Sequence, residues 1–190
     1  MVKKILLTLV LLVVVCAGVV LALAMTKPNT YHVERKTEVA ASPATVYSLI
    51  NDFQRWPDWS PWEHLDPAMK RTIGTPSAGV GATYAWVGND KVGEGKMTIN
   101  ESVPDSKVDV RLDFIKPFAS SDHVIFDIQP RGSGTEVTWS MTGDHNIVSK
   151  VMCVFISMDK MIGPDFERGL GALKNLAEKS SAATDSTAKS

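Results

Sequence analysis

The chain contains few of the residues from which metal centres and disulfide frameworks are built. Its two cysteines are Cys16, inside a long apolar run, and Cys153, so one folded domain cannot hold both and no internal disulfide is expected. The four histidines, His32, His64, His123 and His145, match no metal-ligand spacing. We therefore expect no metal site and no cofactor.

The sequence also lacks the motifs that usually mark a catalytic centre. There is no Gly-x-Ser-x-Gly motif, and no predicted helix follows the glycine pairs at 79–81 and 93–95, as a phosphate-binding loop requires. Cys153 lies in an apolar stretch that predicts an inert, buried thiol on a helix. We assign no catalytic residue, which argues against an enzyme without excluding one.

Acidic residues outnumber basic residues in the part of the chain that follows Asn29. All 21 acidic residues follow Asn29, whereas Lys3, Lys4 and Lys27 precede it and leave fewer than 20 basic residues after it. A protein that binds nucleic acid needs a basic face. The charge balance therefore excludes nucleic acid as a partner.

The longest feature that is present is the uncharged apolar run Ile5–Met25. As a helix rising about 1.5 Å per residue it would cover roughly 30 Å, the thickness of a bilayer core. A cleaved signal peptide remains the alternative, because Lys3 and Lys4 precede the run and 22–24 resembles a cleavage site. The run, however, exceeds the apolar region of about 7–15 residues found in signal peptides. We therefore predict an uncleaved transmembrane anchor that holds the chain in a membrane.

The orientation of that anchor follows from its short N-terminal tail. Basic residues lie on both sides of the run and do not decide between the two orientations. A tail of residues 1–4 with no folded mass is typical of a signal anchor. We expect a single-pass protein of a bacterial inner membrane, with 1–4 in the cytoplasm, 26–30 as a linker and the remaining domain on the extracytoplasmic side.

The remaining sequence predicts one α+β domain. Ser42 and Pro43 begin a helix that follows a first strand, and the proline-rich stretch 53–67 cannot form a regular α-helix. Apolar residues at helical spacing predict a long helix that ends near Glu178 and precedes a disordered tail, 179–190. The expected strands are 31–39, 81–87, 91–103, 107–114, 122–129 and 135–142.

The sequences of the predicted strands indicate a sheet with one face exposed to solvent. From Lys107 to Phe114, charged and apolar residues alternate without exception. The turns between the later strands are short, which makes neighbouring strands antiparallel. The sequence thus predicts an antiparallel meander covered on its inner face by the C-terminal helix.

Three motifs in residues 31–178 are shared with a known family. They are Ser42-Pro43-x-x-Val46-Tyr47, Asp52-Phe53-x-x-Trp56-Pro57-x-Trp59-Ser60-Pro61-Trp62 and Asp165-Phe166-Glu167-x-Gly169-Leu170. With these motifs the chain resembles the START-like superfamily, in its polyketide cyclase/dehydrase (SRPBCC) branch. The resemblance implies a helix-grip fold, in which a curved sheet wraps around a long C-terminal helix and leaves a cavity between them. Relatives include lipid carriers, aromatase/cyclases, plant hormone receptors and chaperone activators.

Aromatic and methionine residues are the candidate ligand-binding residues. Trp56, Trp59 and Trp62 recur every third residue and can share one side of a helix with three residues per turn. They predict either an aromatic wall at a cavity mouth or a set of rings that fixes an irregular segment to the sheet. The other candidates face inward by alternation or helical spacing, and are Trp86, Phe114, Phe126, Trp139, Met161 and Phe166.

Three functions are compatible with these features. The first is a membrane-anchored domain that binds a hydrophobic small molecule or lipid in an internal cavity. The second is a cyclase- or dehydratase-like enzyme, which needs a titratable group in that cavity. His123 or Arg35 could supply one if the strand register differs by one residue from the predicted register. The third is an adaptor that binds another protein through the sheet or the tryptophan-rich segment.

Overall fold

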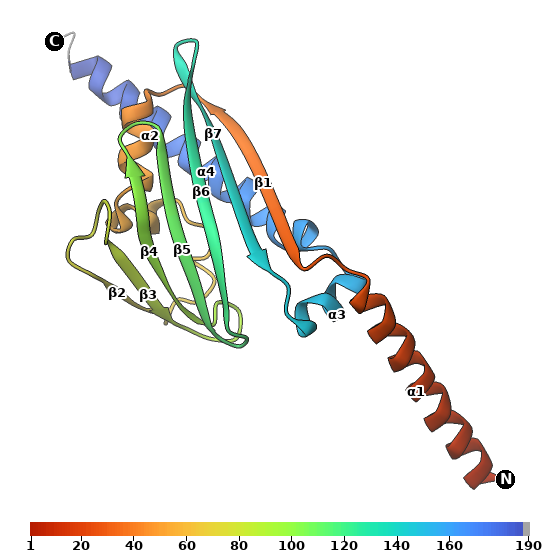
Figure 1. The fold of residues 1–190 in the computed structure, drawn as a ribbon. Coiled ribbons are helices and arrows are strands. Elements are labelled where there is room, and N and C mark those ends of the chain that lie inside the picture. Colours follow the sequence, from red (N-terminus) through yellow and green to blue (C-terminus); the bar gives the residue numbers. More distant parts are fainter. Residues whose placement is uncertain (188–190) are drawn as a thin grey trace.

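The computed structural model describes residues 1–187, which form a helical arm and an α+β domain (Figure 1). The helices are α1 (Val2–Met25), α2 (Pro43–Ile50), the 3₁₀ helix η1 (Phe53–Asp58), α3 (Ile147–Phe155) and α4 (Met158–Thr187). The strands are β1 (Thr30–Val39), β2 (Lys70–Ile73), β3 (Thr83–Val87), β4 (Glu94–Val103), β5 (Lys107–Lys116), β6 (Ser120–Arg131) and β7 (Gly134–Asp144).

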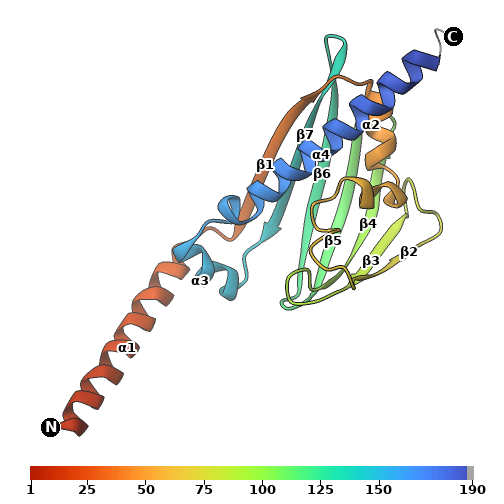
Figure 2. The same cartoon turned by 180° about the vertical axis from the view of Figure 1, so that it is seen from behind.

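The strands form one antiparallel sheet in the order β1-β7-β6-β5-β4-β3-β2. Helix α4 crosses one face of this sheet, with α2 and η1 beside it (Figure 2). The outer face is open and carries the charged residues of the alternating strands, as in β5. The helix-grip architecture predicted from the sequence is therefore confirmed.

The core lies between the sheet and α4. In β6 and β7 every second residue is buried, and their register pairs Phe126 with Trp139 and Val124 with Met141. Leu170 and Leu173 of α4 are buried against this face. Burial of these apolar side chains holds helix and sheet together.

Local hydrogen bonds fix the segment between β1 and β2. The Ser42 hydroxyl accepts from the amide of Thr45 at 3.2 Å and caps α2, whose first residue is Pro43. After α2 the chain forms η1 rather than an α-helix, in agreement with the prolines of this segment. The indole N–H groups of Trp56 and Trp59 donate to the carbonyl oxygens of Ile50 and Leu49, at 2.9 and 3.1 Å.

The structure differs from the sequence-based expectations in the C-terminal half. Helix α4 continues to Thr187, although we predicted a disordered tail from Lys179; the helix is already anchored by its buried face, so adding residues to its end requires no new nucleus. Residues 188–190 of that predicted tail lie outside the described residues. Cys153 does lie on a helix, α3, but the prediction that its thiol is buried is wrong. The residue is partly exposed, and α3 has no buried residue.

Helix α1 projects away from the domain as a separate arm (Figure 1). It begins at Val2, inside the predicted tail, and its apolar side chains are exposed almost throughout; Ala24 is its buried residue. Its length and composition suffice to cross a membrane, and a signal sequence would have the same properties. Its last turns contact α3, which lies between α1 and the domain.

Candidate functional site

A cavity of about 330 Å³ lies between the inner face of the sheet, the segment 60–69 and the first turns of α4. Its wall is largely apolar. The sheet contributes side chains such as Met97, Leu112 and Val124, and α4 contributes Met158 and Ile162. Methionine side chains adapt their shape, so this wall can follow ligands of different outline.

Seven of the nine residues predicted to bind a ligand line this cavity. They are Trp56, Trp62, Trp86, Phe114, Trp139, Met161 and Phe166. The other two, Trp59 and Phe126, are buried behind the wall, with their ring centroids 6.0 Å apart. The sequence pattern thus identified the apolar face correctly but could not separate the lining from the layer beneath it.

The three tryptophans of the irregular segment serve different purposes. Trp56 and Trp59 are buried, and their indole N–H groups bind backbone carbonyls of α2, so they fix this segment to the domain. Trp62 is only partly buried and packs edge-on against Trp139 and Phe166, with ring centroids 5.7 and 6.3 Å apart. The fixing role therefore holds for Trp56 and Trp59, of which Trp56 also lines the cavity, whereas Trp62 forms part of the cavity wall.

Trp139 and Phe166 form the aromatic floor of the cavity. Their rings are stacked, with centroids 4.2 Å apart and an interplanar angle of 11°. Gly169 permits this approach, because a Cβ atom there would lie 2.7 Å from the Trp139 ring. The indole N–H of Trp139 is buried and has no hydrogen-bond partner within the described part of the chain.

The first polar group of the wall is a buried carboxylate on the segment 60–69. Glu63 is 4 % exposed and accepts hydrogen bonds from the Tyr84 hydroxyl and from Nε of Arg71. Arg71 also donates to the Glu63 carbonyl at 2.9 Å. Burial, together with the hydrogen bond to Glu63, raises the pKa of Tyr84 above its ordinary value of 10.0. Glu63 and Tyr84 both line the cavity.

A second carboxylate–tyrosine pair lies on β6 and β1. Asp122 is 2 % exposed and accepts from the Tyr31 hydroxyl at 2.9 Å and from the Ser120 hydroxyl at 3.2 Å. Gly143 leaves room for the pair, because a Cβ atom there would overlap the Asp122 carboxylate. Burial raises the pKa of Asp122, and the two hydrogen bonds offset only part of that effect. Asp122 and Tyr31 also line the cavity.

The sequence analysis missed both carboxylates. Asp122 has the same parity on β6 as Val124 and Phe126, so the alternation that placed those residues inward also placed Asp122 inward. The sequence alternation of β6 therefore contained the information that Asp122 faces inward. Glu63 lies in an irregular segment with no period, and nothing in the sequence indicated its burial.

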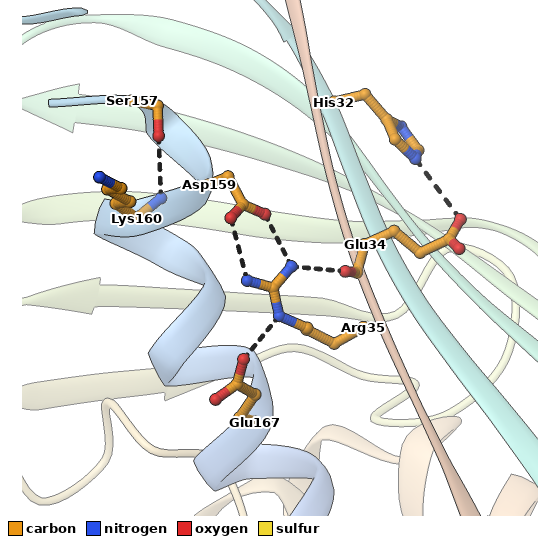
Figure 3. A network of polar contacts seen from close by, with 7 residues as sticks. All are labelled: His32, Glu34, Arg35, Ser157, Asp159, Lys160 and Glu167. Atoms are coloured by element: carbon orange, nitrogen blue, oxygen red, sulfur yellow. Dashed lines mark hydrogen bonds and ion pairs between the residues drawn. The ribbon is translucent and has the colours of Figure 1, made fainter.

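Neither residue that we considered as a catalytic alternative reaches the cavity. His123 is exposed on the outer face of β6. Arg35 points toward the start of α4, where it binds Asp159 and Glu167 (Figure 3). These two carboxylates raise the pKa of Arg35 above its usual value. Within residues 1–187, no group of His, Cys, Asp and Glu side chains is arranged to hold a metal ion.

Comparison with protein families gives one match that spans most of the chain. Residues 30–178 match the family described as polyketide cyclase / dehydrase and lipid transport. The chain belongs to this family. A comparison with curated proteins gives no match.

Solved structures with the same fold include members that differ widely in their sequences. The di-domain aromatase/cyclase StfQ of the steffimycin pathway is 11 % identical with a TM-score of 0.62, over 80 % of this chain and 52 % of StfQ. The Aha1 dimer from Colwellia psychrerythraea is 16 % identical with a TM-score of 0.55, over 78 % and 96 % of the two chains. An uncharacterized protein from Rhizobium leguminosarum is 12 % identical with a TM-score of 0.58, over 79 % and 95 %. At these identities the likeness shows a shared fold alone.

Proposed function

We propose that this chain is a membrane-anchored member of the family that holds one hydrophobic small molecule or lipid in its cavity. The observation that carries the proposal is the unfilled space of about 330 Å³ with an aromatic and methionine-rich wall. Small-molecule sites occupy about 300–1,000 Å³ and combine apolar walls with a few polar groups. Here the polar groups are the Glu63–Tyr84 and Asp122–Tyr31 pairs.

The size and the wall restrict the class of ligand. An apolar cavity of about 150 Å³ accommodates a single benzene ring, so this cavity fits a molecule of about two to three fused rings or one folded acyl or isoprenoid chain. A phospholipid with two full acyl chains exceeds that space. Each tyrosine hydroxyl already donates to a carboxylate, which leaves the phenolic oxygens and carboxylates free to accept from a ligand hydroxyl or amine.

The apolar helix α1 supports the membrane location of this function. An apolar ligand is poorly soluble in water and concentrates in bilayers. A domain joined to a bilayer by the short segment 26–30 could collect such a ligand locally but could not travel between membranes. Local sensing, presentation or modification therefore fits the chain better than bulk transport. On this proposal 31–178 is the ligand-binding domain, and it lies outside the cytoplasm of a bacterial cell.

The test compares the full chain with a variant whose cavity is filled. Leu112→Phe adds a ring at the cavity wall, and Val103→Phe adds the same ring on an exposed position of β4. Each protein is extracted into lipid discs with a copolymer instead of detergent, and its organic extract is analysed by mass spectrometry. We expect one apolar compound to be enriched over the bulk lipids with the wild type and Val103→Phe and to be depleted with Leu112→Phe. Equal extracts from all three would overturn the proposal.

The buried carboxylates also support a second function, that of a cyclase- or dehydratase-like enzyme. A cavity-facing carboxyl group with a raised pKa, such as that of Asp122, is suited to proton transfer. Asp122→Asn keeps the shape and removes the titration. If the domain is an enzyme, the compound that co-purifies with Asp122→Asn will differ chemically from that of the wild type, because substrate will accumulate. The same compound in both proteins argues for binding alone.

A further inference from the structure

Helix α3 is an amphipathic helix that the rest of the chain leaves largely exposed. None of its residues is buried, and it contains one charged residue, Lys150, and no acidic residue. Its exposed apolar side chains include Phe155, which is 75 % exposed, Ile147 and Met152. A patch of this kind on a soluble surface is unfavourable unless something covers it.

The turn between β5 and β6 extends the same apolar surface. Phe118, at this turn, is 53 % exposed. It lines a second pocket of about 120 Å³ together with Val148 and Met152 of α3, so the turn and the helix both border this pocket. We call α3 and residues 115–118 the apolar rim.

The position of α1 identifies what covers the apolar rim. The C-terminal turns of α1 contact α3. The linker is tied to α3 and to the residues just before it, because Nζ of Lys150 donates to Oδ1 of Asn29 at 2.6 Å and the amide of His145 donates to the Asn29 carbonyl at 2.7 Å. When α1 is inserted, α3 is therefore held at the level where the chain leaves the hydrocarbon. Amphipathic helices with basic residues on one face and large apolar side chains on the other bind in that layer.

The second pocket adjoins the cavity. Four residues line both, namely Tyr31, Ser120, Asp122 and Met158. The Tyr31–Asp122 pair thus lies between the second pocket, which the apolar rim flanks, and the apolar interior. A ligand that passed from the second pocket into the cavity would meet the pair before it reached the aromatic floor.

We propose that the apolar rim lies in the headgroup layer of the bilayer that α1 crosses, and that the second pocket is the opening through which an apolar ligand passes between bilayer and cavity. This inference rests on the proposed function for the ligand and on insertion of α1 for the membrane. The rim buries its apolar side chains in lipid, which removes their exposure to water. The ligand crosses no aqueous space on its way to the cavity.

The cysteines of the chain allow a direct test of depth. In Cys16→Ser, a nitroxide placed on Cys153 reports from α3. In a second protein, which carries Cys16→Ser, Cys153→Ser and Ser133→Cys, it reports from the exposed β6–β7 turn, at the opposite end of the domain (Figure 1). Both are reconstituted as full chains in phosphatidylcholine–phosphatidylglycerol nanodiscs. We expect collisions with oxygen to dominate at Cys153 and collisions with a water-soluble nickel chelate to dominate at position 133. Equal access of the nickel chelate to both labels would overturn the proposal.

A kinetic measurement tests the opening separately from ligand binding. Phe155→Asp and Phe118→Asp alter exposed side chains, so the fold should be retained. Uptake of the apolar dye phenylnaphthylamine from the nanodisc is followed by energy transfer from the cavity tryptophans. We expect severalfold slower uptake in both variants with the same final occupancy, whereas Leu112→Phe lowers the final occupancy. Unchanged uptake in both Asp variants would overturn the proposal that the second pocket is the opening. A loss of final occupancy confined to Leu112→Phe supports the proposed function but says nothing about the opening.

Discussion

The guanidinium group of Arg35 on β1 forms two parallel hydrogen bonds with the carboxylate of Asp159 in the first turn of α4, at 2.7 and 3.1 Å (Figure 3). Its Nε donates to Glu167 at 2.7 Å. This arrangement connects the edge strand of the sheet to the start of the helix that carries Met158, Met161 and Ile162 into the cavity. Arg35 therefore positions the cavity wall without reaching the cavity.

The glycine opposite Arg35 gives a first prediction about stability. A Cβ atom on Gly163 would overlap the Arg35 guanidinium, whereas nothing lies within 4 Å of a Cβ on Gly171 of the same helix. Gly171→Ala should stabilise the fold by about 0.5–1 kcal/mol, the usual gain of alanine in a helix. Gly163→Ala should lack most of this gain, because the added Cβ displaces the guanidinium group of Arg35 and disturbs its ion pairs. Urea unfolding of the full chain in detergent micelles measures both; equal gains in the two variants would contradict the prediction.

The indole N–H groups of two buried tryptophans give a second prediction. Trp59→Phe leaves the Leu49 carbonyl without its partner, which costs about 1–3 kcal/mol in addition to the lost apolar area. Trp139→Phe removes an N–H that is buried without a described partner. Its loss of stability should therefore be smaller than that of Trp59→Phe by about 1–3 kcal/mol, the cost of the unpaired carbonyl. The midpoints of urea unfolding of the two variants provide the comparison. Equal losses would show that the Trp139 N–H is satisfied in solution.

The parts of the fold that the sequence predicted depend on patterns within single elements. The alternation of β5, the Ser42-Pro43 helix start and the apolar run of α1 each depend on neighbours along the chain. Strand β2 has four residues at the sheet edge, mostly exposed, and therefore shows no alternation to detect. Short edge strands are defined by their partner rather than by their own sequence.

The polar groups of the site depend on contacts between distant residues. Arg35 and Asp159 are 124 positions apart, and Tyr31 and Asp122 are 91 apart. Strand alternation can place Asp122 on the inner face, but it cannot supply the hydroxyl that binds it. Likewise, a periodic pattern identifies apolar faces and cannot show that Phe126 lies behind the cavity wall while Trp139 forms it. Those distinctions require the packed structure.

The raised pKa of Asp122 leads to a third prediction, on pH dependence. Between the ordinary value of 3.8 and the raised value in the folded chain, the folded state binds more protons than the unfolded state. Stability therefore falls as pH rises through this window. Asp122→Asn cannot titrate and should lack this fall, so its stability relative to the wild type should increase from acidic to neutral pH. Urea unfolding at a series of pH values measures the difference.

Asp113 provides a control of opposite sign. Hydrogen bonds from Ser121 and Arg111 outweigh partial burial and lower its pKa below 3.8. Its contribution to stability is therefore present above the ordinary pKa and is lost as pH falls through the lowered value. Asp113→Asn should be destabilised relative to the wild type at neutral pH and approach it in acid. If both variants changed in the same direction with pH, the environment assigned to Asp122 would be wrong.

The fourth prediction concerns the N-terminal helix. If α1 is a retained anchor, a C-terminally tagged chain from bacterial membranes will have the full mass of 20.7 kDa plus the tag and will resist extraction with alkaline carbonate. Cleavage after Ala24 would remove almost the whole of α1 and release the domain.

The orientation of the anchor is tested by labelling from outside the cell. In spheroplasts, a membrane-impermeant maleimide should label Ser133→Cys in the background without Cys16 and Cys153, because in the predicted orientation the domain and its β6–β7 turn lie outside the cytoplasm. Labelling only after lysis would place the domain in the cytoplasm. The access of the domain to lipid would then be from the inner leaflet, since the contact between α1 and α3 is the same in either orientation.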